Sequence, residues 1–240
     1  METNFFVVRI YGGLGNQLFQ YALSLYLEKI YNIPVYLETS FYKNSHREFL
    51  LPKLFMVKVY DGDYTKLPIY KEKIEFMYDK ELEKLDVTIN YCFDGYWQSK
   101  IIVQSIVDDI KIEKISNSNF GIHIRRTDYL NNPDIFIDLT NTGYYRKALS
   151  YAGNRKVVIF SDDIEWCKKY GNNQDFRYSN GDTISDFKEM INCAGLVIAN
   201  STYSLWAAYF NNGEIYAPSL WQCNESYIKD SICLDNWRII

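Results

Sequence analysis

The stretch "GLVIANSTYSLWAAYFNNGEIYA", residues 195–217, decides the fold. An apolar run at 195–200 is followed by a helical pattern at 201–210 and by a second apolar run at 214–217. A strand, a helix and a strand in this order form a βαβ unit, whose two strands lie parallel in one sheet. We therefore expect an α/β fold with a parallel sheet.

The same alternation extends upstream through the chain. We predict strands at 120–126 and 156–161, and helices at 143–152, 163–171 and 184–194. Near the N-terminus we predict a strand at about 5–11, a helix at about 15–31 and a strand at 34–38, because apolar residues recur there at strand and helix spacing. The pattern is weaker over 40–118, where we expect short helices and one aromatic strand and turn at 93–99.

Composition limits the class of protein. The chain has 240 residues, of which 48% are apolar and 23% charged, so it has enough material for a real core. A net charge of −4 argues against a nucleic-acid binder. No apolar run approaches the roughly 18 residues that span a bilayer, and we interpret the N-terminal "FFVVRIY" as a strand, not a signal peptide. Five widely spaced cysteines without a CxxC pair are typical of reduced thiols.

From these features we expect a cytoplasmic protein, either free or peripheral at the inner membrane face. The chain has only two histidines, His46 and His123, which excludes a histidine-rich metal site. A polar, turn-rich segment lies near 112–119. We therefore predict two domains, 1–115 and 116–240.

The segment "YGGLGNQLFQYA", residues 11–22, places three glycines between a strand and a helix. This arrangement lets backbone N–H groups and a helix N-terminus face an anion or a polar ligand. The spacing matches neither GxGxxG nor the P-loop pattern. The alternative is a tight turn that serves only the skeleton of the protein.

The segment "HIRRTDY", residues 123–129, ends a predicted strand. Ligands of open parallel sheets gather outside the carboxyl ends of strands. Two arginines, Arg125 and Arg126, suit a diphosphate there, because the guanidinium fork matches phosphate oxygens and stays charged. The alternative is a structural ion network with Asp128 and neighbouring carboxylates.

Polar residues follow two further predicted strands. Asn200, Ser201 and Thr202 precede a helix and could either cap it or cradle a phosphate. Asp162 and Asp163 follow the strand at 156–161 and could either cap the next helix or hold a ribose or a base edge.

A DxD pattern occurs at Asp61 and Asp63 in "YDGDY". Some glycosyltransferases hold a divalent metal with such a pair. Asp-Gly is also a common turn sequence, and we favour the turn.

Five segments occur in an order that resembles one family: "GGLGNQLFQYA", "GYWQS", "HIRRTDY", "FSDDIEW" and "DFKEMINCAGLVIANSTYSLWAA". Together they resemble the α-1,2-fucosyltransferases of glycosyltransferase family 11, from residue 7 to about 240. The resemblance implies a GT-B-like pair of Rossmann-type domains with parallel sheets. It also implies inverting transfer from GDP-fucose to a galactoside acceptor glycan, with no metal and no cofactor besides the donor substrate. The N-terminal domain would serve the acceptor side and the C-terminal domain would bind GDP-fucose.

The resemblance also suggests site residues. It implies Arg125 as the contact to the phosphates, Asn16 at the reacting centre and Asp128 as the obvious candidate for the base. Asn16 and Gln17 would hydrogen-bond sugar or phosphate oxygens. The remaining residues expected to shape the donor site are Gly13, Gly15, His123, Arg126, Asp162, Asp163, Asn200, Ser201 and Thr202. The chain departs from the family pattern at Thr127, Gly143, Gly195 and Leu205.

Three other functions stay open at this point. The protein could be a metal-dependent transferase that uses Asp61 and Asp63. It could be a non-catalytic carbohydrate-binding protein on a degenerate transferase scaffold, which would ignore GDP. It could also be an interaction protein in which the arginines only form ion pairs.

Overall fold

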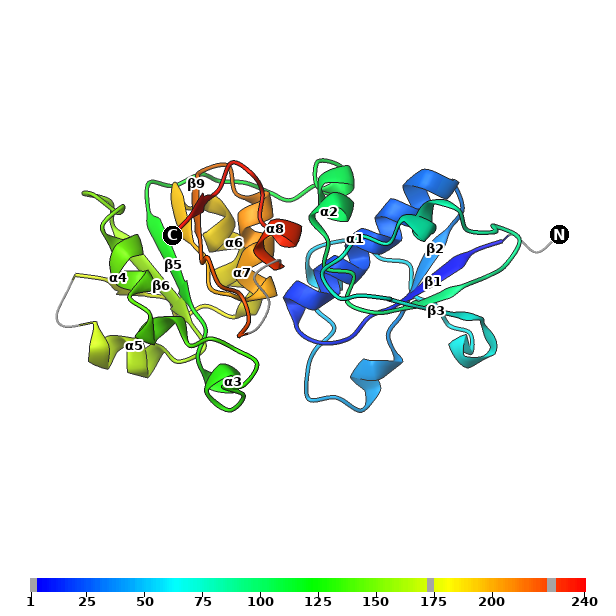
Figure 1. The fold of residues 1–240 in the computed structure, drawn as a ribbon, viewed down its shortest axis with the longest axis horizontal. Coiled ribbons are helices and arrows are strands. Elements are labelled where there is room, and N and C mark those ends of the chain that lie inside the picture. Colours follow the sequence, from blue (N-terminus) through cyan, green and yellow to red (C-terminus); the bar gives the residue numbers. More distant parts are fainter. Residues whose placement is uncertain (1–3, 172–174, 224–227) are drawn as a thin grey trace. The chain divides into compact units, whose positions relative to one another are not determined.

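Parallel strands form two separate sheets, and each sheet belongs to its own unit of the chain (Figure 1). The computed structural model describes residues 4–171, 175–223 and 228–240. Unit 1 is Met1–Lys111 and unit 2 is Ile112–Ile240. The roles that the resemblance implies for the two parts of the chain remain predictions.

Unit 1 holds a sheet in the order β2-β1-β4-β3 with all neighbours parallel. Its strands are β1 (Phe6–Arg9), β2 (Val35–Glu38), β3 (Ile69–Lys71) and β4 (Cys92–Asp94). Helix α1 (Leu14–Tyr31) connects β1 to β2 and packs against α2 (Lys100–Ile106). Short 3-10 helices fill the weakly patterned region: η1 (Ser40–Lys43), η2 (Leu51–Lys53), η3 (Tyr64–Lys66) and η4 (Lys80–Glu83).

Unit 2 holds a sheet in the order β10-β9-β8-β5-β6-β7, also parallel throughout. Its strands are β5 (Phe120–Ile124), β6 (Val157–Ser161), β7 (Arg177–Tyr178), β8 (Gly195–Val197), β9 (Glu214–Ala217) and β10 (Arg238–Ile239). Its helices are α3 (Thr127–Leu130), η5 (Leu139–Asn141), α4 (Tyr144–Leu149), α5 (Ile164–Tyr170), α6 (Thr183–Asn192), α7 (Thr202–Phe210) and α8 (Ile228–Ile232). Helices α4 and α5 cover one face of this sheet, and α6 and α7 cover the other (Figure 1).

The sheet of unit 2 has a topological switch point, where the chain leaves two neighbouring strands in opposite directions. In unit 2 the chain runs from β5 to β6 and β7 on one side, whereas β8, β9 and β10 extend from the other side of β5. In unit 1 the central neighbours are β1 and β4: the chain leaves β1 toward β2, whereas β4 is reached from the edge strand β3 and is the last strand of the sheet. This central pair is called the switch point of unit 1 below. Ligands of open α/β sheets bind outside the carboxyl ends of the strands at such points. The residues after β5, β8, β1 and β4 are therefore the candidates for a ligand-binding site.

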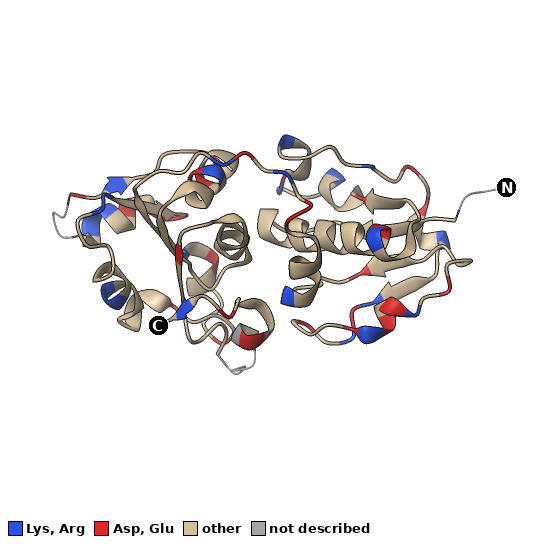
Figure 2. Ribbon diagram, turned by 90° about the horizontal axis from the view of Figure 1, so that it is seen from above, with Lys and Arg blue, Asp and Glu red and all other residues tan. Residues whose placement is uncertain are grey.

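The expected α/β fold with parallel sheets is confirmed, including the βαβ unit formed by β8, α7 and β9. Acidic and basic residues are interspersed over both units (Figure 2). None of the helices in the described ranges is both long and apolar enough to cross a bilayer.

Candidate functional site

Arg125 follows β5 directly at the switch point of unit 2. Its Nε and Nη2 donate to the two carboxylate oxygens of Asp128 at 2.8 and 2.7 Å, and its Nη1 lies 3.3 Å from Asp162 Oδ2. Burial acts to lower the pKa of Arg125, but the hydrogen bond to Asp128 and the charge of Asp162 outweigh it and raise this pKa. A guanidinium has five N–H donors, so these contacts leave part of the donor set for a ligand.

Arg126 is enclosed, in contrast to its neighbour. Its side chain is 10% exposed, against 26% for that of Arg125. Its guanidinium carbon lies 3.7 Å from the centroid of the Trp166 ring, and Nη1 donates to Thr140 Oγ1 at 3.2 Å. Ion pairs to Asp163 at 3.4 Å and Asp138 at 3.8 Å complete the surroundings. Arg126 therefore ties the end of β5 to α5 and η5.

Asp162 and Asp163 are engaged in local structure. Asp162 accepts from the backbone N–H of Arg126 at 2.9 Å, from that of Thr127 at 3.1 Å and from the Thr127 hydroxyl. Asp163 caps α5 by accepting from the backbone N–H of Trp166 at 3.2 Å. Of the two roles considered for this pair, Asp163 therefore has the helix-capping one. The departure from the family pattern at Thr127 adds a hydroxyl that helps to fix Asp162.

The end of β8 lies beside the end of β5 and leads into α7. Asn200 is 2% exposed, and its Nδ2 donates to the carbonyl oxygens of Ile137 and Trp221, both at 3.0 Å. Ser201 is the N-cap residue by backbone position, but its side chain makes no capping hydrogen bond. Thr202 begins the helix. The start of α7 thus lacks the side-chain cap that the sequence suggested, and its dipole favours a negative charge at this place.

His123 lies within β5 and is 3% exposed. Its ring meets the Tyr203 ring edge-on at 5.4 Å. Burial, and secondarily the charge of Arg125, lowers the pKa of His123 to about 3, although Asp162 acts in the opposite direction. The imidazole is therefore neutral near pH 7 and packs beneath the turn that carries Arg125.

A positive φ and close contacts explain the glycines in the turn after β1. Gly12 has a φ of +82°, and a Cβ there would stand 3.0 Å from Asn16 Nδ2. A Cβ on Gly13 would stand 3.1 Å from Arg47 Nη1. Gly15 is buried in the first turn of α1. Gln98, which follows β4, donates through Nε2 to Asn16 Oδ1 at 3.2 Å, so Asn16 lies at the switch point of unit 1.

Gln17 does not face a ligand, and that expectation is wrong. Its side chain is fully buried; Nε2 donates to the carbonyl oxygens of Gly12 at 3.2 Å and Glu48 at 2.9 Å, and Oε1 accepts from the N–H of Leu50 at 2.8 Å. Gln20 is buried in the same way and accepts from the N–H of Tyr11 at 3.0 Å. These two amides hold the loops around the turn, which leaves Asn16 as the candidate.

Sequence reasoning missed Glu72, which follows β3 at the same edge of the sheet. Its carboxylate accepts from the backbone N–H groups of Tyr96 at 2.7 Å and Trp97 at 3.0 Å. Burial raises the pKa of Glu72 to about 7. No pattern in the sequence marks it, because β3 is a short edge strand with exposed residues.

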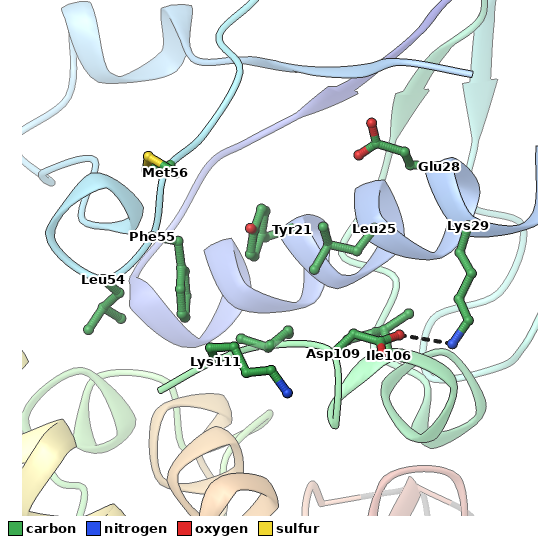
Figure 3. A pocket seen from close by; sticks show the side chains of 11 residues that line it. Tyr21, Leu25, Glu28, Lys29, Leu54, Phe55, Met56, Ile106, Asp109 and Lys111 are labelled. Atoms are coloured by element: carbon green, nitrogen blue, oxygen red, sulfur yellow. Dashed lines mark hydrogen bonds and ion pairs between the residues drawn. The ribbon is translucent and has the colours of Figure 1, made fainter. Parts of the chain in front are cut away.

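A groove with a volume of about 590 Å³ lies along the flank of α1 (Figure 3). The Tyr21 and Phe55 rings stack there with their centroids 5.3 Å apart, and the ion pair between Lys29 and Asp109 spans 2.9 Å at its edge. The other residues that line it are Leu25, Glu28, Leu54, Met56, Ile106, Ile110 and Lys111. None of them belongs to the carboxyl end of a strand.

The DxD pair lies in a turn. Asp63 caps η3 by accepting from the N–H of Thr65 at 3.1 Å, and it pairs with Lys66 at 3.6 Å. Within residues 4–171, 175–223 and 228–240, no group of three or more histidine, cysteine or acidic side chains is arranged to hold a metal ion.

The other departures from the family pattern have local explanations. Gly143 has a φ of +81° before α4, a conformation that glycine adopts at little cost. A Cβ on Gly195 would stand 2.7 Å from Phe120 Cδ2, so a larger residue there would require the buried Phe120 ring to shift. Leu205 is fully buried in α7.

A family model described as glycosyl transferase family 11 matches residues 3–240. The alpha-1,2-colitosyltransferase of Escherichia coli is 30% identical over an alignment 282 positions long, which covers 96% of this chain and 97% of that protein. The O-antigen biosynthesis glycosyltransferase WbnK of Escherichia coli is 26% identical over 297 positions, covering 94% and 97%.

Among solved structures, the fucosyltransferase NodZ from Bradyrhizobium matches with a TM-score of 0.58 at 14% identity, covering 88% of this chain and 93% of that chain. NodZ, an α-1,6-fucosyltransferase, has been co-crystallised with GDP and soaked with GDP-fucose. At this identity the similarity shows a shared fold.

Proposed function

Because the chain belongs to glycosyltransferase family 11, we propose that it is an inverting α-1,2-fucosyltransferase that moves L-fucose from GDP-fucose to a galactose-containing glycan. One observation carries the proposal. At the switch point of unit 2, the partly exposed Arg125 follows β5 while α7, which lacks a side-chain cap, starts after the neighbouring β8. A guanidinium and a helix N-terminus at adjacent strand ends suit a diphosphate.

The chemical step places new negative charge on the leaving diphosphate. Cleavage of the bond between fucose and phosphate leaves GDP with an additional charge, and fixed donors that meet this charge lower the barrier. We assign this task to Arg125, with the start of α7 at Ser201 and Thr202 in support. Arg126, Asp162 and Asp163 hold the turn in which Arg125 lies, and Asn200 anchors the loop before α7.

Asp128 acts on Arg125 in this proposal. Both of its carboxylate oxygens accept N–H groups of that guanidinium, so we assign it the orientation of Arg125 and not the removal of the acceptor's proton. Asn16 in unit 1 would hydrogen-bond a sugar oxygen without adding charge. Gly13 and Gly15 shape the backbone that presents it.

A second donor is favoured by one specific observation, which is that the relative with 30% identity is an α-1,2-colitosyltransferase. Colitose is fucose without one ring hydroxyl. A site that hydrogen-bonds this hydroxyl would reject the analogue strongly, whereas an apolar site would discriminate weakly. The ratio of kcat/KM for GDP-fucose and GDP-colitose decides between the two donors.

The proposal is tested by GDP release from GDP-fucose against a panel of galactosides, with and without EDTA. We expect release that depends on the galactoside and survives EDTA, in keeping with a metal-independent transferase. Loss of activity in EDTA would favour the metal-dependent alternative at Asp61 and Asp63.

A thermal-shift experiment tests donor binding separately. GDP and GDP-fucose should raise the melting temperature, because a ligand that binds only the native state stabilises it by mass action. UDP-galactose should not. Equal shifts with both nucleotide classes would contradict the donor, and glycan binding without any GDP effect would favour the carbohydrate-binding alternative.

We also propose that the protein works in the cytoplasm, on acceptors that include glycans linked to the inner membrane face. Cell fractionation with an antibody against the native chain tests this location. Recovery only from the culture medium would contradict it.

A further inference from the structure

A continuous row of aromatic rings borders the Gly12 turn of unit 1. Consecutive centroids lie 5.1, 6.1, 5.1 and 5.5 Å apart along the series Tyr96, Tyr11, Phe41, Tyr42 and Phe49. None of these five side chains is fully buried, and Phe41 is 39% exposed. These five residues are called the aromatic row below.

The aromatic row is attached to the switch point of unit 1. Tyr11 follows β1 and Tyr96 follows β4, the two strands that flank that point. The Tyr42 hydroxyl donates to the carbonyl oxygen of Gly12 at 3.1 Å. Since the Asn16 amide lies against Gly12, the rings surround the turn from which Asn16 projects.

Arg47 adds a group of hydrogen-bond donors beside the row. Its side chain is exposed, its Nη1 lies against Gly13, and the described residues offer its guanidinium neither an ion pair nor a side-chain hydrogen bond. Burial raises the phenol pKa values of Tyr42 and Tyr96, and the nearby charge of Arg47 opposes this rise in both. The charge of the Arg47 guanidinium therefore acts on both phenols.

We propose that the aromatic row and Arg47 bind the acceptor glycan through its pyranose rings; this inference rests on the transferase function proposed above. A pyranose has C–H groups on its faces and hydroxyls around its edge. The faces of aromatic rings carry negative potential, which attracts C–H groups, while guanidinium N–H groups donate to hydroxyl oxygens. Five rings offer more aromatic surface than one pyranose can contact, so the aromatic row accommodates an acceptor of several sugars.

The groove along α1 is the rival surface, because it also contains a stacked aromatic pair, Tyr21 and Phe55. It lies away from the strand ends, and ion pairs occupy its edge. Phe55 therefore provides a matched control for Phe49, since both are partly buried phenylalanines that stack on a tyrosine of unit 1.

The test compares Phe49→Ala, Arg47→Ala and Phe55→Ala with methyl β-galactoside and with a galactose-terminated tetrasaccharide. We expect Phe49→Ala to raise the KM for the tetrasaccharide about tenfold, as for the loss of one aromatic contact, and to leave kcat and the affinity for GDP unchanged. The KM for methyl β-galactoside should change little, because Phe49 lies at the far end of the row. Arg47→Ala should raise the KM for the tetrasaccharide, and Phe55→Ala should change neither.

Saturation-transfer NMR of the tetrasaccharide on the same variants reports binding without catalysis, and Phe49→Leu replaces Phe49→Ala if the latter melts early. An unchanged KM for the tetrasaccharide in both Phe49→Ala and Arg47→Ala, or a rise only in Phe55→Ala, overturns the inference and leaves the transferase function intact. Conversely, glycan binding that depends on Phe49 in a protein insensitive to GDP supports the surface and contradicts the transferase function.

Discussion

The central strand ends of the two sheets differ in topology and in the side chains that follow them. In unit 2 the strand ends carry two arginines and the carboxylates that pair with them. In unit 1 the last residues of β1, β2 and β4 form ion pairs with one another, Arg9 with Glu38 and Asp94. The turns beyond these strands carry amides and aromatic rings around Asn16 and Gln98. A parallel sheet therefore determines where a ligand binds, while the side chains at the strand ends determine which ligand. Fixed charges suit a diphosphate, and neutral amides and rings suit a sugar.

The largest effect concerns the buried arginine on which the charged switch point is built. Arg126→Ala should lower the free energy of unfolding by about 3 kcal/mol, because it leaves Asp163 and Asp138 without the cation that they surround. Chemical unfolding followed by circular dichroism measures this change. Arg177→Ala is the control, since Arg177 forms an exposed pair with Glu189, and such pairs contribute up to about 1 kcal/mol. Equal losses in the two variants would contradict the structural role of Arg126.

The second effect tests the exposed arginine of the same pair. Arg125→Lys keeps the charge but loses the paired donors, so turnover should fall by about 10²-fold, as for the loss of one preorganised donor. Arg125→Ala should reduce turnover further and should also weaken GDP binding. Steady-state transfer and GDP titration measure both, with the melting temperature and Arg177→Lys as controls. Transfer by Arg125→Lys at the wild-type rate would show that the bidentate phosphate contact is absent.

The third effect tests the switch point of unit 1. Asn16→Ala should reduce turnover about tenfold through the loss of one neutral hydrogen bond to substrate, with little change in stability. Its neighbour gives the matched comparison: Gln17→Ala should lower the melting temperature, because it removes the side-chain partner of the Leu50 N–H and of the Glu48 carbonyl oxygen and one of two donors to the Gly12 carbonyl oxygen. Kinetics and thermal unfolding on both variants separate the two roles. If Asn16→Ala unfolds while the folded fraction turns over normally, Asn16 is structural.

The sequence predicted the two sheets well, because the long apolar strands and the amphipathic helices carry clear periodicity. It missed β3, β7 and β10, which have two or three residues, lie toward the edges of the sheets and are mostly exposed. Missing β3 also concealed Glu72. A short strand with few buried residues leaves no apolar pattern to detect.

Adjacent residues were harder to separate than whole elements. Arg125 and Arg126 are equivalent in the sequence, and only the fold brings Trp166 over the second of them. Asn16 and Gln17 differ by one step on α1, a rotation of about 100° that moves the side chain into the core. In both cases the distinction depends on partners far away in the chain, which local spacing does not report.

The smallest effect compares the two histidines, one in each unit. His123 in unit 2 is buried with its pKa lowered to about 3, whereas His46 in unit 1 is exposed. In the unfolded chain the pKa of His123 returns to about 6.5, so its neutral form contributes stability above that pH and loses this contribution as the pH falls toward 3.

Between pH 7.5 and pH 6 the loss should be about 0.8 kcal/mol in the free energy of unfolding. His123→Phe should remove this part of the pH dependence, and it breaks no hydrogen bond at Nδ1, which lacks a partner among the described residues. His46→Gln should keep this part of the pH dependence. Denaturant titrations at the two pH values measure the difference for each variant. Parallel curves for the wild type and His123→Phe would mean that folding leaves the pKa of His123 near its usual value. The imidazole beneath Arg125 would then take up a proton in the folded protein as the pH falls to 6.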